Sequence, residues 1–270
     1  MGRNILLLFY CLCAISGNAQ SYVQFNNKIF EVQEKQKNNT SIYAQGEAIV
    51  FYSERNTITQ FVLSNVSAQT NNLKSYTLKI KTNHIDGKLI AFGKEQIFNS
   101  DDSLAKSSSD SSFMFNLLNK ESIITIKNNF PRSQKDTSAS MLLVMQDDPA
   151  KYILPLNRNQ IKLGYSWVDS IIITDSKSIN QYIITKTNPD SIQLTVYKEL
   201  QQTIKLLQDG KMIEQRLNGF STSTRWYNTA SSLLQNENSI TNFSGSTNMG
   251  DQSLPITIAI QTSVQVKEKK

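Results

Sequence analysis

Cysteine, histidine and long apolar runs are all scarce in this chain of 270 residues. Its two cysteines, Cys11 and Cys13, both lie within the first nineteen residues, and its single histidine is His84. Beyond residue 19 the sequence therefore excludes disulfides, thiolate metal sites and cysteine nucleophiles. A metal site or catalytic machinery built on several histidines is excluded as well. A chain of this length buries enough apolar surface to be stable without such cross-links.

The first nineteen residues, "MGRNILLLFYCLCAISGNA", have the layout of a secretory signal peptide. Arg3 precedes an apolar segment from Ile5 to Ile15, and Gly17 and Ala19 supply small residues at a cleavage site. The apolar segment is too short to span a bilayer, and no later stretch approaches the length of a membrane span. We therefore expect cleavage after Ala19 and a soluble exported protein, periplasmic or extracellular. Neither cysteine follows the small residues that a lipoprotein signal needs, so we expect no lipid anchor.

Charge of either sign is spread thinly along the chain. The formal net charge is +6, and 27 basic residues stand against 22 acidic ones once Arg3 is set aside. Only the end of the chain, "KEKK" at 267–270, is densely basic, and we treat 268–270 as a charged tail. Nucleic-acid-binding proteins concentrate positive charge on one face or helix. We therefore expect no nucleic-acid partner.

Apolar residues alternate with polar ones along most of the chain, which predicts β-strands. The pattern occurs in "SYTLKIK" at 75–81, in "DSIQLTVYK" at 190–198 and most regularly in "LPITIAIQTSVQVK" at 254–267. A strand of this kind buries one face and exposes the other, as in an antiparallel sheet. The fold is therefore predicted to be mainly β. Two short helices are predicted at 111–120 and 229–237, and turns at Asp86–Gly87 and Asp209–Gly210.

Two segments a hundred residues apart resemble one another. "KTNHIDGKLIAFGKE" at 81–95 and "KTNPDSIQLTVYKE" at 186–199 align with one residue skipped after the shared KTN. The inward positions remain in phase after Asp86 and Asp190, as a structural repeat requires. We interpret the match as a duplication, with an N-terminal β lobe at 20–148 and a C-terminal β lobe at 149–267. The predicted fold is thus two similar antiparallel curved-sheet lobes with one or two short helices.

The second half of the chain also carries a set of motifs. "IKLGYSWVDS" at 161–170 contains a G-x-S/T-W step, and Tyr182, Gly219 and the Gly250, Pro255, Ile256 series follow it. This pattern resembles a family of uncharacterised exported β-rich proteins of Bacteroidota. That family has a D-x-x-T-G-x-L turn where this chain reads "NTASSLL", with Asn228, Ser231 and Ser232 in place of Asp, Thr and Gly. The resemblance implies two β lobes that are similar to periplasmic lipoprotein-carrier folds, with a curved sheet around an apolar cavity, and it implies no catalytic residue.

Catalytic and metal-binding motifs are missing from the sequence. His84 has no second ligand nearby, and no G-x-S-x-G elbow presents a serine nucleophile. The acidic pairs Asp101–Asp102 and Asp147–Asp148 lie in loop-like sequence, where neighbouring carboxylates cannot flank a glycosidic bond on their own. We therefore predict no catalytic residue, no metal site and no cofactor.

Four aromatic residues are the candidates for a ligand site. Tyr165, Trp167, Trp226 and Tyr227 carry polar groups on apolar rings, as residues at carbohydrate and lipid sites do. The same residues also close the ends of β cores, and Trp167 in particular precedes the apolar run "SIIIT". Both interpretations, rim of a ligand site and core packing, are open at this point.

The sequence favours an exported, non-catalytic binding or carrier protein of the bacterial cell envelope, with an apolar small molecule, a lipid or a lipoprotein as its ligand. One alternative is a structural or interaction module that binds an envelope protein through edge strands or loops. A less favoured alternative is a hydrolase built on carboxylates, which requires two of them to converge in a cleft.

Overall fold

A computed structural model describes residues 27–66, 75–102, 118, 121–127, 130–131, 149–154, 156, 158–173, 176–208, 211–249 and 252–269. These residues form an almost entirely β structure, as predicted. The strands are β1 (Lys28–Ala44), β2 (Glu47–Val66), β3 (Ser75–Ala91), β4 (Lys94–Asn99), β5 (Glu121–Lys127), β6 (Phe130–Pro131), β7 (Ser166–Ile173), β8 (Ser176–Thr187), β9 (Ser191–Gln208), β10 (Lys211–Asn228), β11 (Leu234–Met249) and β12 (Gln252–Glu268). Two short 3₁₀ helices, η1 (Pro149–Tyr152) and η2 (Arg158–Gln160), precede β7.

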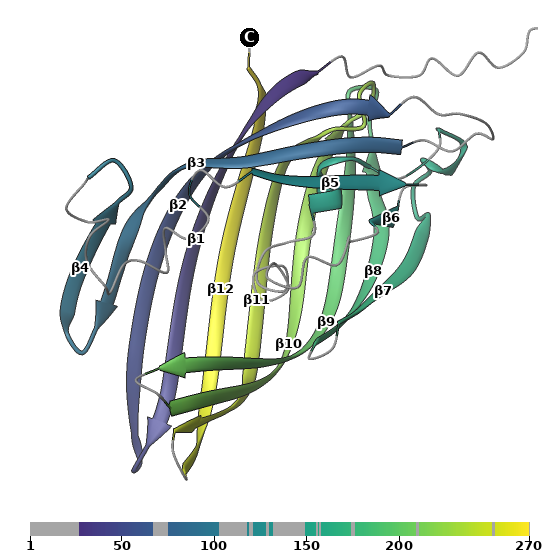
Figure 1. The fold of residues 1–270 in the computed structure, drawn as a ribbon. Coiled ribbons are helices and arrows are strands. Elements are labelled where there is room, and N and C mark those ends of the chain that lie inside the picture. Colours follow the sequence, from purple (N-terminus) through teal and green to yellow (C-terminus); the bar gives the residue numbers. More distant parts are fainter. Residues whose placement is uncertain are drawn as a thin grey trace, which may run out of the picture.

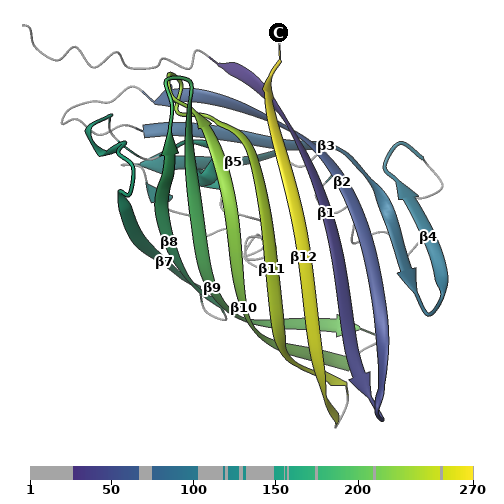
Figure 2. The same cartoon turned by 180° about the vertical axis from the view of Figure 1, so that it is seen from behind.

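All twelve strands belong to one antiparallel sheet in the order β6-β5-β3-β2-β1-β12-β11-β10-β9-β8-β7, with β4 paired to β3 beside this path. The first and last long strands, β1 and β12, pair along thirteen residues from Phe30 to Ile42. Strands from 20–148 thus form one side of the sheet and strands from 149–267 the other. The two predicted lobes are two blocks of one continuous sheet, joined at β1 and β12. Figures 1 and 2 show this sheet curving around an interior, with β12 and β1 at its back.

Alternation of side chains explains why the sheet has one buried face. Along β12, Ile256, Ile258, Ile260 and Val264 are buried, whereas the residues between them are exposed or half-buried. The strands are long: β2 has 20 residues, which corresponds to roughly 65 Å when extended. One face of such a strand can therefore carry several chemically different zones.

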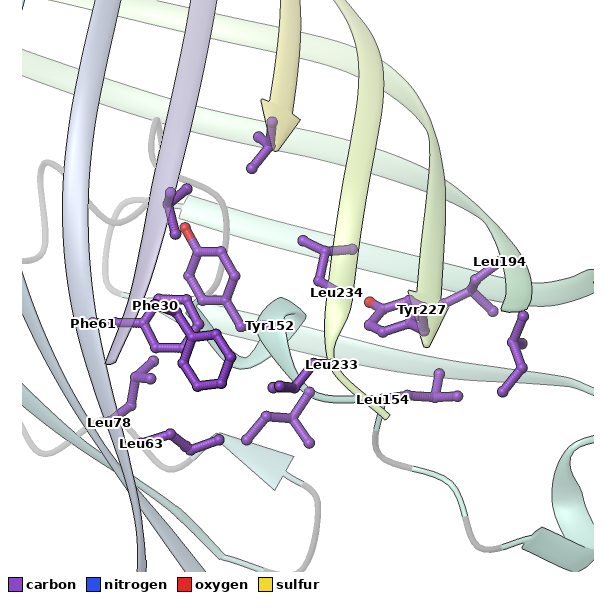
Figure 3. Packing of buried hydrophobic residues seen from close by; sticks show 14 of the residues in the cluster. Phe30, Phe61, Leu63, Leu78, Tyr152, Leu154, Leu194, Tyr227, Leu233 and Leu234 are labelled. Atoms are coloured by element: carbon purple, nitrogen blue, oxygen red, sulfur yellow. The ribbon is translucent and has the colours of Figure 1, made fainter. Parts of the chain in front are cut away.

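The larger core cluster lies at one end of the inner face, where η1 and the residues after it enter the curve of the sheet (Figure 3). Tyr152 stacks on Phe61 with a centroid distance of 5.0 Å, and Phe61 stacks on Phe30 at 4.9 Å. The cluster joins both sides of the sheet, because it includes Leu78 on β3 and Leu194 on β9. Its buried members are Phe30, Val32, Phe61, Leu63, Leu78, Tyr152, Ile153, Leu154, Tyr182, Ile184, Ile192, Leu194, Val196, Tyr227, Leu233, Leu234 and Val264.

The smaller core cluster lies on the same face, further along the strands. It contains Leu217, Phe243, Ile256, Ile258 and Ile260, with Ile42, Leu200 and Ile204 packed against it. Both clusters draw on the same set of alternating positions in β12, since Val264 belongs to the larger cluster and Ile256, Ile258 and Ile260 to the smaller one. The inner face is therefore apolar at two separate levels.

Three β-bulges lie on one line across the sheet. Register shifts leave Asn83 on β3, Thr185 on β8 and Gln235 on β11 without a partner. Each bulge lies next to a member of one row of paired positions that crosses the sheet from β8 to β3. The row consists of Lys186, Gln193, Trp226, Asn236, Gln265, Gln33, Ile58 and His84. Bulges bend a strand and increase its twist. The bulge at Asn83, in the pairing of β3 with β2, accounts for the turn of these two strands across one end of the sheet in Figure 1.

The predicted turn at Asp86–Gly87 is wrong, because both residues lie within β3. A Cβ on Gly87 would lie 2.0 Å from the backbone oxygen of Glu54 and 2.7 Å from the ring of Phe98. Glycine is required here for close approach of another strand and a ring, which is its second common role after turns. The turns of this region are Gln45–Gly46 and Phe92–Gly93, in which both residues have positive φ, as a type I′ hairpin requires.

The predicted hairpin around Asp209–Gly210 is confirmed by the strands beside it, since Gln208 of β9 pairs with Lys211 of β10. The helix predicted at 229–237 is wrong: the chain turns after Asn228 and continues as β11. The side-chain oxygen of Asn228 accepts hydrogen bonds from the backbone nitrogen of Ser231 at 2.8 Å and from its hydroxyl at 3.0 Å. These bonds close a turn instead of a helix. The helix predicted at 111–120 lies outside the described residues, except for Leu118, which forms a β-bridge with Thr82.

The two segments that suggested a duplication have different structural positions. Residues 81–91 continue β3, whereas 188–190 lie in the connection between β8 and β9. Lys94 and Glu95 begin β4 after a turn, but Lys198 and Glu199 lie in the middle of β9. The alignment therefore does not superimpose equivalent strand positions and gives no support for a duplication.

Candidate functional site: the inner face of the sheet

The segment from η1 to β7 covers the end of the inner face that carries the larger core cluster. Ile153 forms a β-bridge with Leu233, and the backbone nitrogen of Leu154 donates to the carbonyl of Ser232 at 2.8 Å. Further along, the nitrogen of Gly164 donates to the carbonyl of Ile184 at 2.9 Å. These bonds attach the segment to β8 and to the β10–β11 turn.

A buried group of three charges attaches the same segment from within. Glu237 on β11 contacts Lys151 Nζ through one carboxylate oxygen and Arg225 Nε through the other, each at 2.7 Å. The three side chains are between 0 and 4 % exposed. The bulge at Gln235 makes this arrangement possible, because it lets both Leu234 and Glu237 point to the inner face. We call Lys151, Arg225 and Glu237 the buried charge cluster.

Tyr227 completes the attachment. Its side chain is 1 % exposed, and its hydroxyl donates to the carbonyl of Lys151 at 2.8 Å. Burial raises the pKa of Tyr227 to about 12, because the phenolate would lose its hydration. The ring is therefore a neutral donor at any physiological pH.

Between the two core clusters the inner face carries polar residues. One row pairs Asn180, Lys198, Ser221 and Thr241 and ends at Ile260 of the smaller core cluster. Thr241 donates to the Ser221 hydroxyl at 2.8 Å. Asn180, which is 3 % exposed, donates to Asp169 on β7 at 2.7 Å. An apolar surface with a few convergent polar groups is characteristic of small-molecule sites.

Several buried polar atoms on the described inner face have no hydrogen-bond partner, among them Thr57 Oγ1 on β2 and groups of two buried residues, Gln202 and Ser223. The amide of Gln202 is one: the residue is 4 % exposed, and neither its nitrogen nor its oxygen is bonded. The hydroxyl of Ser223, which is 2 % exposed, is the other. Gln202 pairs with Leu217 at the level of the smaller core cluster. Buried polar groups are nearly always satisfied, so each exception needs a specific explanation.

The structure brings together three of the four predicted site aromatics and separates the fourth. Trp167 stacks on Tyr182 at 4.7 Å and lies 6.0 Å from Tyr165, and both Trp167 and Tyr165 pack against the larger core cluster. Tyr227 is a buried member of that cluster. Trp226 is its neighbour on β10 and therefore points to the opposite, outer face. The four residues do not form one site, because adjacent positions of a strand face opposite ways.

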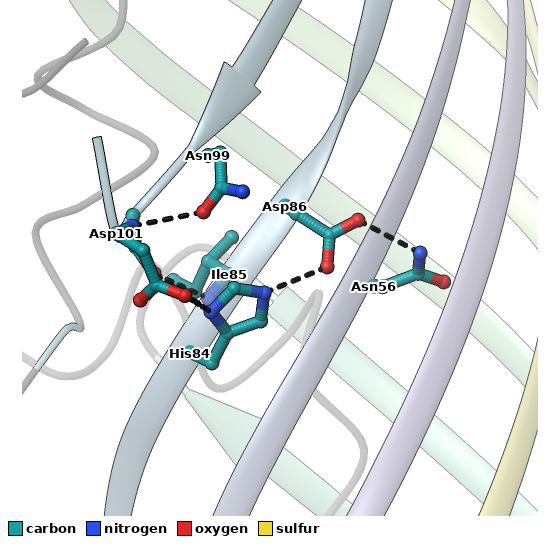
Figure 4. A network of polar contacts seen from close by, with 7 residues as sticks. Asn56, His84, Ile85, Asp86, Asn99 and Asp101 are labelled. Atoms are coloured by element: carbon teal, nitrogen blue, oxygen red, sulfur yellow. Dashed lines mark hydrogen bonds and ion pairs between the residues drawn. The ribbon is translucent and has the colours of Figure 1, made fainter.

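A second polar network surrounds His84 on the outer face (Figure 4). The Nε2 of His84 lies 2.9 Å from Asp86, and its Nδ1 lies 3.2 Å from both the Ser100 hydroxyl and Asp101. Asn56 donates to Asp86 at 2.9 Å. His84 is thus a residue of β3 with three polar contacts, next to the Asp86–Gly87 pair for which the sequence predicted a turn.

Serine, histidine and aspartate in contact resemble the order of a hydrolase triad, but Ser100 is not placed as a nucleophile. Its side chain is 2 % exposed, and its oxygen accepts a bond from the backbone nitrogen of Ile85 at 3.0 Å. The Ser100 nitrogen in turn donates to the Ile85 carbonyl at 2.8 Å. A nucleophile must reach its substrate, whereas these bonds fasten the end of β4 to β3.

Of the predicted acidic pairs, Asp101 belongs to the His84 network, and Asp147–Asp148 lies outside the described residues. Within the described ranges, His, Cys, Asp and Glu side chains form no group of three or more suited to a metal ion. No helix in that part of the chain is long and apolar enough to cross a membrane.

Comparisons with known proteins bear on the fold alone. No protein-family model matches the sequence, and no curated protein matches it. Among solved structures, the chain is similar to lipovitellin, in a structure described as "lipid-protein interactions in lipovitellin". The TM-score is 0.50 at 8 % identity, and the match covers 90 % of this chain but only 26 % of the lipovitellin chain. The likeness therefore concerns one β-sheet region of a much longer protein.

Sequence reasoning missed the buried charge cluster and Gln202. Lys151 lies between two loop-like stretches, and Arg225 and Glu237 are twelve residues apart with a turn between them. A charged or amide side chain at a position that alternation assigns to the buried face was the available signal, and Arg225 and Gln202 provide it. The contact of Arg225 with Glu237 could not be inferred, because it depends on the bulge at Gln235.

Proposed function

We propose that this chain is an exported, non-catalytic protein that binds an apolar ligand or lipid on the inner face of its curved sheet. The observation that carries the proposal is the composition of that face. It presents two apolar clusters separated by a polar level, instead of one continuous core. An elongated ligand with apolar chains and polar groups matches such an alternation.

The fold likeness adds support. The structure of lipovitellin is described by its lipid–protein interactions, and the region that resembles it includes nearly the whole of this chain. A curved sheet of long strands provides a wide inner surface. Because the sheet is already rigid, binding a ligand there requires little further ordering of the protein. The proposed role in the cell envelope follows from the predicted signal peptide at 1–19 and from the resemblance to exported proteins of Bacteroidota.

Mass spectrometry of the purified chain under native conditions, before and after solvent extraction, tests the proposal. The expected result is a stoichiometric apolar adduct that is lost on extraction and regained on incubation with a lipid extract. Ile260→Thr changes the inner face, where Ile260 is 8 % exposed, and should reduce the uptake. Ile240→Thr is the matched control, because Ile240 is 55 % exposed on the outer face of the neighbouring strand.

An unliganded mass that stays unchanged in the presence of lipid would contradict the proposal. The alternative role, a protein-interaction module of the envelope, would then become the better explanation. Equal loss of uptake in both isoleucine variants would also contradict it, since binding would then not depend on the inner face.

A further inference from the structure

Gln202 lies in an apolar neighbourhood that offers its amide no partner. Its paired neighbour on β10 is Leu217, which is 2 % exposed, and Leu200 and Ile204 flank it on β9. Its amide nitrogen and oxygen are both unbonded although the residue is 4 % exposed. Leaving both groups unpaired in an apolar interior is costly. A group that enters from outside the chain would remove that cost.

The surroundings determine which group would fit. Three rows of paired inner-face positions lie at this level and directly beside it. The first, from β8 to β1, contains Ser176, Gln202, Leu217, Gly245, Ile256 and Ile42; the second, between the same strands, Ser178, Leu200, Gly219, Phe243, Ile258 and Thr40; and the third, from β9 to β12, Ile204, Gln215, Thr247 and Leu254. None of these positions holds an ionisable side chain. A charged group would therefore be buried without a counter-charge, which is strongly unfavourable.

We infer that Gln202 is the polar contact for a neutral hydrogen-bonding group of an apolar ligand, such as a hydroxyl, ester or amide carbonyl. The inference rests on the proposed function. The Gln202 amide donates through its nitrogen and accepts through its oxygen, which suits an ester with a neighbouring hydroxyl. The aliphatic part of the ligand lies on the smaller core cluster. The Ser223 hydroxyl is six residues from the level of Gln202 along the paired strands, or roughly 20 Å, and is a separate position.

Binding of three probes to the delipidated full chain tests this assignment: a monoacylglycerol, the fatty-acid anion of the same chain length, and a hydrocarbon. The wild-type chain should bind the monoacylglycerol most tightly. Gln202→Leu should weaken the binding of the monoacylglycerol about five- to tenfold, as expected for one hydrogen bond to a buried group. It should leave the affinity for the hydrocarbon unchanged. Gln202→Met, which preserves the unbranched shape, should behave in the same way.

Gln201→Leu is the matched control. Gln201 is the same residue type at the next position of β9, exposed on the outer face, and its replacement should leave all three affinities unchanged. The unliganded Gln202→Leu chain should also melt at a higher temperature than the wild type, because an unpaired amide is replaced by an apolar group.

Two outcomes overturn the inference separately from the proposed function. If wild type and Gln202→Leu bind monoacylglycerol equally, the amide is satisfied by water or by the protein itself and the assignment fails while apolar binding stands. The same holds if the fatty-acid anion binds best. If the wild-type chain binds none of the three probes, the proposed function and the inference fail together.

Discussion

Replacement of Glu237 by glutamine would remove the only negative charge from the buried charge cluster. The substitution keeps the shape of the side chain but removes the carboxylate charge that Lys151 and Arg225 both contact. Both contacts of Glu237 are 2.7 Å long, and the three side chains are at most 4 % exposed. Removal of one partner from such a buried arrangement typically costs about 3 to 5 kcal/mol, because the remaining charges have lost their hydration.

Urea unfolding followed by circular dichroism measures the effect. With an m value on the order of 3 kcal/mol per molar urea for a chain of this size, the midpoint of Glu237→Gln should fall by about 1 to 1.7 M. The double variant Lys151→Met/Glu237→Gln should be more stable than the single variant, since it buries one cation fewer. This partial recovery distinguishes loss of charge balance from a simple packing defect.

The ion pair of Arg216 with Glu214 provides a matched control on the same sheet. Its N–O distance is also 2.7 Å, but the Arg216 side chain is 72 % exposed. Exposed pairs contribute less than about 1 kcal/mol, so Glu214→Gln should barely move the midpoint. Equal shifts for Glu214→Gln and Glu237→Gln would refute the reasoning, because burial would then not determine the contribution of the pair.

Three further predictions concern single positions. Ser232→Gly should stabilise the chain by up to about 1 kcal/mol, because Ser232 has a φ of +58°, which glycine adopts without steric cost. Gly87→Ala should destabilise the chain by about 3 kcal/mol, since the new Cβ would lie 2.0 Å from the backbone oxygen of Glu54. Thermal melts of the Ser232 and Gly87 variants measure both effects. Burial raises the pKa of Tyr227 from 10.0 to about 12. The folded state therefore keeps a proton that the unfolded state loses, and the resulting stability is complete below pH 10 and is lost as the pH rises to about 12. The loss amounts to about 2 to 3 kcal/mol, and Tyr227→Phe should lack this dependence in alkaline unfolding curves.

Each of these predictions has a control in the same chain. Ser231→Gly should destabilise, because it removes a hydrogen bond to Asn228 in the same turn. Gly46→Ala should cost only about 1 to 2 kcal/mol, since its φ is +85° but no atom lies within 4 Å of the new Cβ. Tyr43→Phe, at an exposed position, should preserve the alkaline loss. A Gly46 variant that is less stable than the Gly87 variant would contradict the close-approach argument.

Glycine-containing turns illustrate how far sequence patterns reach. An Asp–Gly pair predicted a turn at 86–87, but the chain turns at Gln45–Gly46 and Phe92–Gly93 instead. The pattern identifies residues that tolerate positive φ. It cannot identify a glycine that is needed because another strand and the ring of Phe98 lie against it.

At the candidate site, too, the sequence predicted some features and could not predict others. Alternation predicted the inward positions of β12. Ile256, Ile258, Ile260 and Val264 are indeed buried, whereas Thr262 and Val266 of the same series are half-buried. The predicted site aromatics Tyr165, Trp167 and Tyr227 do lie at the larger core cluster. The sequence could not show that Trp226 lies outside the candidate site. Trp226 and Tyr227 are adjacent aromatic residues, so only one of them faces inward, and the sequence does not indicate which one.

The sequence by itself determined the strands, the buried face of the most regular ones and the β character of the fold, because these follow from local alternation of apolar and polar residues. Only the tertiary structure decided that the two halves share one sheet through β1 and β12, and that three bulges fall on one line. It also decided that Lys151 meets Arg225 and Glu237, and that Gln202 lies unpaired among apolar residues. Each of these depends on how strands and segments pair and pack, which is set by the whole face rather than by any one segment.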